Sequence, residues 1–185
     1  MKNPKLQKNI NVIQSVLLNK AYIALGTNIG NWKNNFNQSF IQINKIGHIT
    51  NFGSVYLSNP CGFKDQNLFY NTAIELTTTL GAVKLMEELT IIEKKIHKNK
   101  FFVNGPRRID LDIIFYNKMI INNKFVSIPH PRAHLRDFVL CPIYDMNPFF
   151  IHPSEKKTIK ELINNLEENY IVKKVNRQKD SVLIY

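Results

Sequence analysis

Residues 104–116 decide the fold, and they read NGPRRIDLDIIFY. The Gly-Pro pair marks a turn, because a proline disfavours the α conformation in the residue before it. From Ile109 onward apolar and acidic residues alternate, and successive side chains of a strand point to opposite faces. Residues 109–116 are therefore predicted to form a strand that carries Asp110 and Asp112 on one face and apolar anchors on the other.

Two carboxylates on one strand face indicate a metal site. Neighbouring carboxylates repel each other unless a cation lies between them, and Mg²⁺ is usually held by one or two carboxylates together with substrate phosphates. Arg107 and Arg108, just upstream, add positive charge suited to a phosphate chain. The alternative is a solvated strand face balanced by the arginines. The apolar surroundings and the basic chain favour a metal–phosphate site.

The charge of the chain limits the classes of partner. With 185 residues, 44% of them hydrophobic, the chain suits a single folded domain. Three explanations compete for its net charge of +11: a nucleic-acid partner, an anionic small substrate such as a nucleotide, or a genome whose codons favour Lys, Asn and Ile. These three residue types are spread along the whole chain, and the dense basic cluster at 94–100 is short. We therefore expect no nucleic-acid partner.

The cysteine content and the hydropathy pattern indicate the cellular compartment in which we expect the protein. Cys61 and Cys141 do not make a disulfide framework, which favours a reducing cytoplasm. No apolar run reaches the roughly 18 residues of a membrane span, and the N-terminus lacks the long apolar segment of a secretory signal. We expect a cytoplasmic monomer that does not contact membranes.

Periodicity divides the chain into alternating strands and helices. We expect a basic N-terminal extension at 1–19, mobile or weakly helical, a domain at 20–176 and a tail at 177–185. Asn31 is a candidate N-cap and Gly47 a candidate C-cap. Strands that alternate with helices and hairpins predict an α+β sandwich with one mixed, mainly antiparallel sheet flanked by helices. The predicted strands are 21–25, 48–57, 69–79, 109–116, 119–121, 124–128 and 170–175, and the predicted helices are 32–46, 81–96, 142–144 and 159–166.

Two further groups of residues are candidates for ligand contacts. Phe69 and Asn71 share a strand face beside a polar loop, where they suit a flat heterocycle, although an Asn satisfied by the backbone is an equally good interpretation. His130, His134 and Arg136 gather after a short strand. Phosphate contacts fit these three better than zinc does, because no Cys or acidic residue completes a zinc spacing.

In combination these motifs resemble the 6-hydroxymethyl-7,8-dihydropterin pyrophosphokinases. The matching segments follow the order of that family and cover most of the chain from Lys20 to Val175. Gly-Pro-Arg-x-x-Asp-x-Asp joined to Pro-His-Pro-Arg is specific, whereas each motif alone is weak. The matching segments are AYIALGTNIG at 21–30, NP at 59–60, DQ at 65–66, FYN at 69–71, GPRRIDLDI at 105–113, IPHPR at 128–132 and RDFVL at 136–140.

The resemblance implies a ferredoxin-like α/β sandwich that transfers pyrophosphate from ATP to the pterin hydroxymethyl group, releasing AMP, in folate biosynthesis. It implies two Mg²⁺ ions held by Asp110 and Asp112, a pterin stacked between Phe69 and Phe138, and an adenine near Ile113. The implied catalytic residues are Asp110, Asp112, Arg107, His130 and Lys98. The implied ATP-binding residues are Lys98, Lys100, Arg107, Ile113, His130 and Arg136, and the implied pterin-binding residues are Ser58, Asn59, Cys61, Phe69, Asn71, Asp110 and Phe138.

The chain departs from the family pattern in the loop before Gly105. The family usually has arginines that clamp ATP there, and a Trp directly before Gly-Pro-Arg, where this chain has Lys98, Lys100 and Asn104. Lysine provides a point charge without the bidentate fork of arginine. We therefore expect a looser grip on phosphate or a slower closed state of this loop, and Lys98→Arg should raise the rate in steady-state assays. An unchanged or lower rate would count against this explanation.

Two other classes of protein remain open at this point. A basic nucleic-acid-binding domain would bind DNA or RNA tightly, in a salt-dependent way and without pterin. A Mg²⁺-dependent phosphoesterase would also use paired carboxylates and a nearby histidine. The aromatic–amide group of Phe69, Asn71 and Phe138 separates the alternatives, because it suits a bound heterocycle and has no clear role in a phosphoesterase.

Overall fold

Strands form where apolar residues recur every second position, and helices form where they recur about every 3.6 positions. The computed structural model describes residues 18–96 and 105–175, so most of the predicted extension at 1–19, the tail at 177–185, Lys98 and Lys100 lie outside the described residues. The elements are β1 (Asn19–Thr27), α1 (Trp32–Ile43), β2 (His48–Phe52), β3 (Tyr56–Ser58), β4 (Phe69–Thr78), α2 (Ala82–Ile96), β5 (Asp110–Tyr116), β6 (Ile121–Asn122), β7 (Ser127–Ile128), the 3₁₀ turn Ala133–Leu135, α3 (Asp137–Met146), α4 (Ile159–Asn164) and β8 (Ile171–Lys174).

The main sheet has the strand order β5-β1-β4-β3-β8, and β2 also pairs with β4. Every pair among the described strands is antiparallel, which confirms the predicted mainly antiparallel sheet. β1 therefore runs between β4 and β5. Its register places Gly26 opposite Asn71 on one side and Asp110 on the other, and Ala24 opposite Asp112. β6 and β7 form a separate hairpin.

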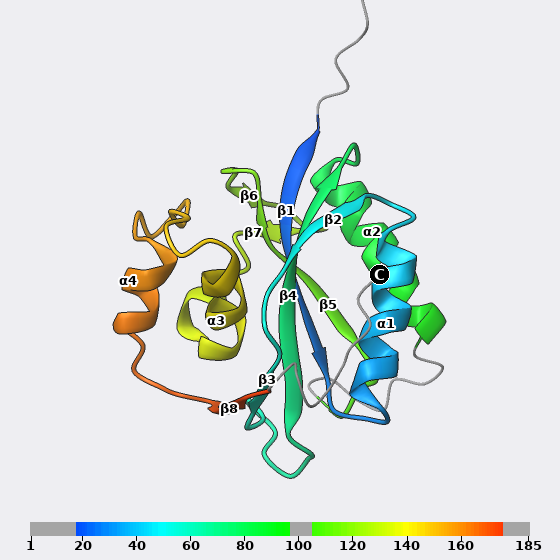
Figure 1. Ribbon diagram of the computed structural model, residues 1–185. Coiled ribbons are helices and arrows are strands. Elements are labelled where there is room, and N and C mark those ends of the chain that lie inside the picture. The colour runs from blue at the N-terminus through cyan, green and yellow to red at the C-terminus, as the bar shows by residue number, and fades with distance from the viewer. Residues whose placement is uncertain (1–17, 97–104, 176–185) are drawn as a thin grey trace, which may run out of the picture.

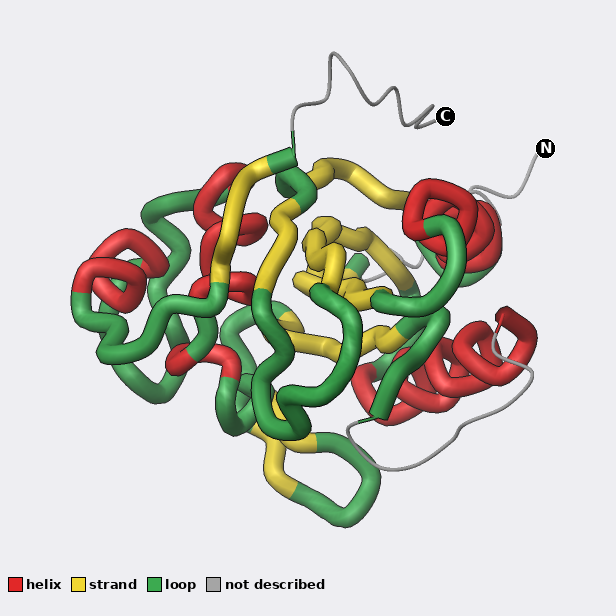
Figure 2. Tube along the Cα trace, turned by 90° about the horizontal axis from the view of Figure 1, so that it is seen from below, coloured by secondary structure: helices red, strands yellow, loops and turns green. Residues whose placement is uncertain are grey.

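Helices cover both faces of this sheet (Figure 1). α1 and α2 lie on one side of the strands, and α3 and α4 on the other, as the end-on view in Figure 2 also shows. Side chains such as Ile23, Leu85 and Leu111 form the core under α1 and α2. Tyr22 and Leu140 belong to a second core under α3 and α4. This arrangement confirms the predicted α+β fold, and no helix in the two described ranges is both long and apolar enough to cross a membrane.

The boundary of α1 shows one correct and one wrong prediction. Asn31 caps the helix as predicted, since its side chain accepts a hydrogen bond from the Asn34 N–H at 3.1 Å. The prediction of Gly47 as the C-cap is wrong, because the helix ends at Ile43 and Asn44 is the capping residue. Gly47 instead passes close to β4, where a Cβ would lie 2.7 Å from the carbonyl oxygen of Thr77.

Two other element boundaries also differ from prediction. The single strand predicted at 48–57 is divided into β2 and β3 around Gly53, where a Cβ would lie 2.4 Å from the carbonyl oxygen of Pro142 on α3. The short helix predicted at 142–144 is the C-terminal part of the longer α3. Pro142 lies inside that helix rather than at its start. The division of the strand was not predicted because the packing partner of Gly53 is far away in sequence.

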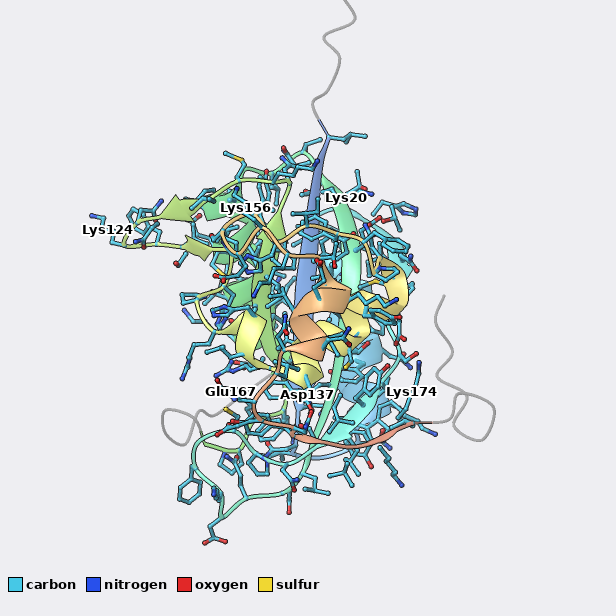
Figure 3. All side chains as sticks on the ribbon, turned by 90° about the vertical axis from the view of Figure 1, so that its left-hand side faces the viewer. Lys20, Lys124, Asp137, Lys156, Glu167 and Lys174 are labelled. Atoms are coloured by element: carbon cyan, nitrogen blue, oxygen red, sulfur yellow. The ribbon has the colours of Figure 1, made fainter. Side chains whose placement is uncertain are left out.

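Asp137 joins the start of α3 to the edge strand β8. Its carboxylate accepts hydrogen bonds from the backbone N–H groups of Phe138 at 2.7 Å, Tyr170 at 2.7 Å and Ile171 at 2.8 Å. In Figure 3 Asp137 lies directly beside that strand. A buried carboxylate needs such donors to offset the cost of leaving water. The contacts therefore hold the first turn of α3, and Phe138 with it, in a defined position.

His152 should make the fold sensitive to acid. It is buried, and its Nδ1 accepts hydrogen bonds from the N–H groups of Ser154 and Glu155. The proton of the neutral ring is therefore on Nε2. Burial is the main cause that lowers the pKa of His152, and the neighbouring His134 lowers it further, while Glu155 acts in the opposite direction.

The unfolded chain consequently binds a proton at His152 more readily than the folded protein does. Stability from this group is present above the unfolded-state pKa of about 6.5 and is lost as the pH falls below it. We expect His152→Asn, whose amide oxygen replaces Nδ1 as acceptor, to lose less unfolding free energy than wild type on acidification. Urea unfolding at about pH 7 and about pH 5 tests this, with the exposed His48→Asn as control. An equal loss in wild type and His152→Asn would rule it out.

Candidate active site

A cavity of about 260 Å³ lies where β1, β4 and β5 meet the loop after β3 and the start of α3. Loops positioned by a rigid sheet are a common place for binding sites. Most of the predicted site residues line this cavity, although they come from five separate parts of the chain. Those residues are Ser58, Asn59, Cys61, Phe69, Asn71, Arg107, Asp110, Asp112, His130, Arg136 and Phe138.

Small residues on β1 leave the floor of the cavity open. On β1, Gly26 and Ala24 lie between β5, which carries Asp110 and Asp112, and β4, which carries Asn71. Both small residues line the cavity. A Cβ on Gly26 would lie 3.1 Å from Oδ1 of Asn71, which is tighter than ordinary packing. The alternation of two small residues along 24–26 is the signal in the sequence that could have identified this floor.

Asp110 and Asp112 form the acidic edge of the cavity. Their alternate positions on β5 place both on the face toward α3, as the pattern predicts. Arg107 Nε lies 3.4 Å from Asp110 Oδ2, and the two side chains are 26% and 31% exposed. Within residues 18–96 and 105–175 no group of three His, Cys, Asp or Glu could hold a metal ion. A pair of carboxylates near basic residues therefore fits Mg²⁺ completed by phosphate oxygens better than zinc, which needs three or four protein ligands.

His130 is a neutral hydrogen-bond donor within a basic wall. Burial, then Arg136 and Arg132, lower its pKa to about 4, against a smaller opposite effect from Asp110. The ring is therefore uncharged near neutral pH. Its Nδ1 accepts from the Arg132 N–H at 3.3 Å, which leaves the Nε2–H available for an anionic oxygen. Arg132 also lines the cavity, although it is not among the predicted site residues.

The other half of the cavity is aromatic and carries an amide. The guanidinium carbon of Arg107 lies 5.3 Å from the ring centre of Phe69, and that of Arg136 lies 5.7 Å from the ring centre of Phe138. Both distances allow cation–π attraction. Asn71 is buried and donates to Ser58 Oγ at 2.9 Å. The cavity thus joins an aromatic, amide-bearing half to a half with carboxylates and cations.

The structure does not bring Ile113 into the cavity. Its side chain is 3% exposed and belongs to the core under α1 and α2. The reason is the alternation of β5, because the period that directs Asp110 and Asp112 toward α3 directs Ile113 to the opposite face. The expected contact with adenine therefore has no support from this cavity.

Fold and cavity together define an α+β domain whose pocket joins an aromatic, amide-bearing half to a half with carboxylates and cations. The family model described as 7,8-dihydro-6-hydroxymethylpterin-pyrophosphokinase (HPPK) matches residues 22–148, which is most of the domain. The chain therefore belongs to this family.

Sequence relatives support the same assignment. A 2-amino-4-hydroxy-6-hydroxymethyldihydropteridine pyrophosphokinase of Aquifex aeolicus is 31% identical over 140 residues, which cover 76% of this chain and 88% of that protein. The folic acid synthesis protein FOL1 of Dictyostelium discoideum is 38% identical over 148 residues, which cover 80% of this chain. That alignment covers only 22% of the Dictyostelium protein, and the alignment with the Pneumocystis carinii protein fol1 covers 18% of it, so the chain spans about a fifth of the length of these relatives.

A solved structure confirms the fold. The crystal structure of wild-type Plasmodium falciparum HPPK-DHPS superposes with a TM-score of 0.65 at 17% sequence identity. The match covers 80% of this chain and 44% of that one. At this low identity the likeness concerns the arrangement of strands and helices alone.

Proposed function

We propose that this domain transfers pyrophosphate from ATP to the hydroxymethyl group of 6-hydroxymethyl-7,8-dihydropterin and releases AMP. One observation carries the proposal: on three adjacent strands, Gly26 separates the carboxylate of Asp110 from the amide of Asn71. A heterocycle held at the amide therefore places its substituent toward the carboxylate edge. Family membership supports the same substrates.

On the pterin side, two aromatic rings and one amide supply recognition. Phe69 and Phe138 stack on the two faces of the pterin, in the manner of aromatic contacts to flat rings. Asn71, already bonded to Ser58 through its NH₂ group, presents its remaining hydrogen-bonding capacity to the ring edge. Asn59 and Cys61 close this half of the pocket.

On the nucleotide side, the chain positions and neutralises a triphosphate. Arg107, Arg132 and Arg136 surround it with positive charge, and neutral His130 donates from Nε2. Asp110 and Asp112 would hold two Mg²⁺ ions, which supply charge neutralisation between the phosphates when bound. In the reaction the hydroxymethyl oxygen loses its proton to water and bonds to the β-phosphorus, the bond between the β-phosphorus and the bridging α–β oxygen breaks, and AMP leaves with that oxygen. Such transfers depend on positioning more than on covalent chemistry.

The test is AMP release from ATP and Mg²⁺ with and without 6-hydroxymethyl-7,8-dihydropterin. AMP that forms only with the pterin is the expected result. Pterin binding without AMP would contradict the proposed catalysis. An absence of both binding and AMP, with salt-dependent binding of DNA or RNA instead, would replace the proposal by the nucleic-acid alternative.

A further inference from the structure

The side chain of Asn28, just after β1, bonds to two other segments that border the cavity. Its NH₂ group donates to Gln66 Oε1 at 3.0 Å and to the carbonyl oxygen of Asn67 at 3.1 Å, both in the loop between β3 and β4. Its Oδ1 accepts from the Arg107 N–H at 2.8 Å. Because the amide has two donor hydrogens and one oxygen, all of its groups are engaged. The residue is 7% exposed.

The backbone around Asn28 strengthens the link to Arg107. The N–H groups of Asn28 and Ile29 both donate to the Arg107 carbonyl oxygen, at 3.0 and 3.2 Å. The turn is itself held by α1, since Asn35 donates to Thr27 Oγ1 and to the Ile29 carbonyl oxygen, each at 2.8 Å. Asn28 therefore projects from a fixed turn toward two segments that are distant in sequence.

Both segments carry groups of the cavity. Arg107 is paired with Asp110 and lies over the ring of Phe69, so the position of its backbone affects both halves of the pocket. The loop that Gln66 and Asn67 belong to also contains Asn59 and Cys61, which line the cavity. Within this loop Gln66 also donates to the Phe63 carbonyl oxygen at 2.7 Å, so the Asn28–Gln66 bond holds a folded loop rather than a single side chain.

We propose that Asn28 is a positioning residue that holds the loop 59–68 and Arg107 at fixed places on either side of the pocket, and so aligns the heterocycle with the phosphate chain. The inference rests on the proposed function. An amide is required because one planar group must donate twice toward the loop and accept once from Arg107. An aspartate would keep the acceptor for the Arg107 N–H but place a carboxylate against two oxygens of the loop. An alanine would lose both side-chain links and keep only the backbone bonds to Arg107.

The test compares Asn28→Asp with Asn35→Asp. Both asparagines are buried and both donate to two oxygens, Asn28 from the turn after β1 and Asn35 from α1 to that turn, so the two variants make the same chemical change. For Asn28→Asp we expect kcat/KM for the pterin to fall by about 10- to 100-fold, since the loop loses two buried hydrogen bonds, while the ATP KM changes by less than about threefold. Asn35→Asp loosens the turn but keeps the bonds of Asn28 to the loop and to Arg107, so it should lower thermal stability and change both constants much less than Asn28→Asp does. Asn28→Ala should in addition raise the ATP KM.

Hydrogen exchange provides a readout that does not depend on turnover. Asn28→Asp should speed exchange in peptides covering 59–68 and leave 105–109 protected, whereas Asn35→Asp should speed exchange only near 27–35. If Asn28→Asp does not fold, Gln66→Leu, which changes a loop side chain, should reproduce the faster exchange at 59–68 and the lower kcat/KM for the pterin.

The outcomes separate this inference from the proposed function. Equal effects of Asn28→Asp and Asn35→Asp on kcat/KM and on exchange, with an active wild type, would overturn the positioning role and leave the function intact. A wild type that releases no pterin-dependent AMP would overturn the function. In that case exchange alone decides the inference: selective loosening of 59–68 in Asn28→Asp supports the placement of the loop by Asn28, and unchanged exchange refutes it.

Discussion

Asp112→Ala should lower kcat for pterin-dependent AMP release by about 10³-fold or more. The reason is that a divalent cation contributes several kcal/mol of charge stabilisation and each ~1.4 kcal/mol is a factor of ten in rate. Asp112 and Asp110 occupy alternate positions on one strand, so the loss of either carboxylate leaves half of the expected cation site. Steady-state assays at saturating Mg²⁺ measure the effect.

Asp112→Ala should lose activity without losing thermal stability. Removing one of two neighbouring like charges relieves repulsion, so metal-free Asp112→Ala should be at least as stable as wild type. Mg²⁺ with a nucleotide should raise the thermal midpoint of wild type, by mass action on the folded state, and raise that of the variant less. Glu87→Ala, an exposed acidic residue on α2, is the control for general loss of charge. Full pyrophosphoryl transfer by Asp112→Ala would remove the metal role assigned to this residue.

Gly26→Val should abolish use of the pterin while the protein stays folded. A Cβ at this position would lie 3.1 Å from Asn71 Oδ1 and 4.0 Å from a ring carbon of Phe69, and the branched methyl groups of valine would extend into the cavity floor. Overpacking of this kind costs about 1–3 kcal/mol. We therefore expect at least about a 100-fold loss in kcat/KM for the pterin with Gly26→Val, and about tenfold with Gly26→Ala.

The matched control for this prediction is Gly81→Ala. No heavy atom lies within 4 Å of a Cβ built there, so it should leave the kinetics unchanged. Valine favours strand conformation, which offsets part of the overpacking cost, so Gly26→Val should have a lower thermal midpoint than wild type but still unfold in one cooperative transition. Titration calorimetry should show that Gly26→Val binds a non-hydrolysable ATP analogue with nearly the affinity of wild type. Normal pterin KM in Gly26→Val would place the heterocycle elsewhere than on this floor.

Local patterns in the sequence correctly predicted the features that depend on near neighbours. The alternation at 109–116 identified β5 and the shared face of Asp110 and Asp112, because a strand has a side-chain period of two. Asn31 was identified as an N-cap for the same kind of reason, since its hydrogen bond reaches only to Asn34. The candidate pocket residues came partly from local pattern and partly from the family resemblance.

Long-range contacts explain where prediction from sequence failed. The local role predicted for Gly47, a helix C-cap, is wrong, and the undivided strand predicted at 48–57 is wrong at Gly53. Both glycines lie close to a distant backbone, at Thr77 and Pro142. Arg132 is not among the predicted site residues, yet it lines the same cavity as Asp110. Such contacts join residues whose separation in the chain carries no periodic signal.

The sequence by itself determined the α+β class, the family, and which faces of β5 are acidic and apolar, because these follow from short-range periodicity and from contiguous motifs. Only the tertiary structure decided that β1 runs between β4 and β5, that Gly26 therefore forms the floor between Asn71 and Asp110, and that Asn28 bonds to both the β3–β4 loop and Arg107. The physical reason is that the pairing of strands is set by the burial of two whole faces of the sheet, which no single segment contains.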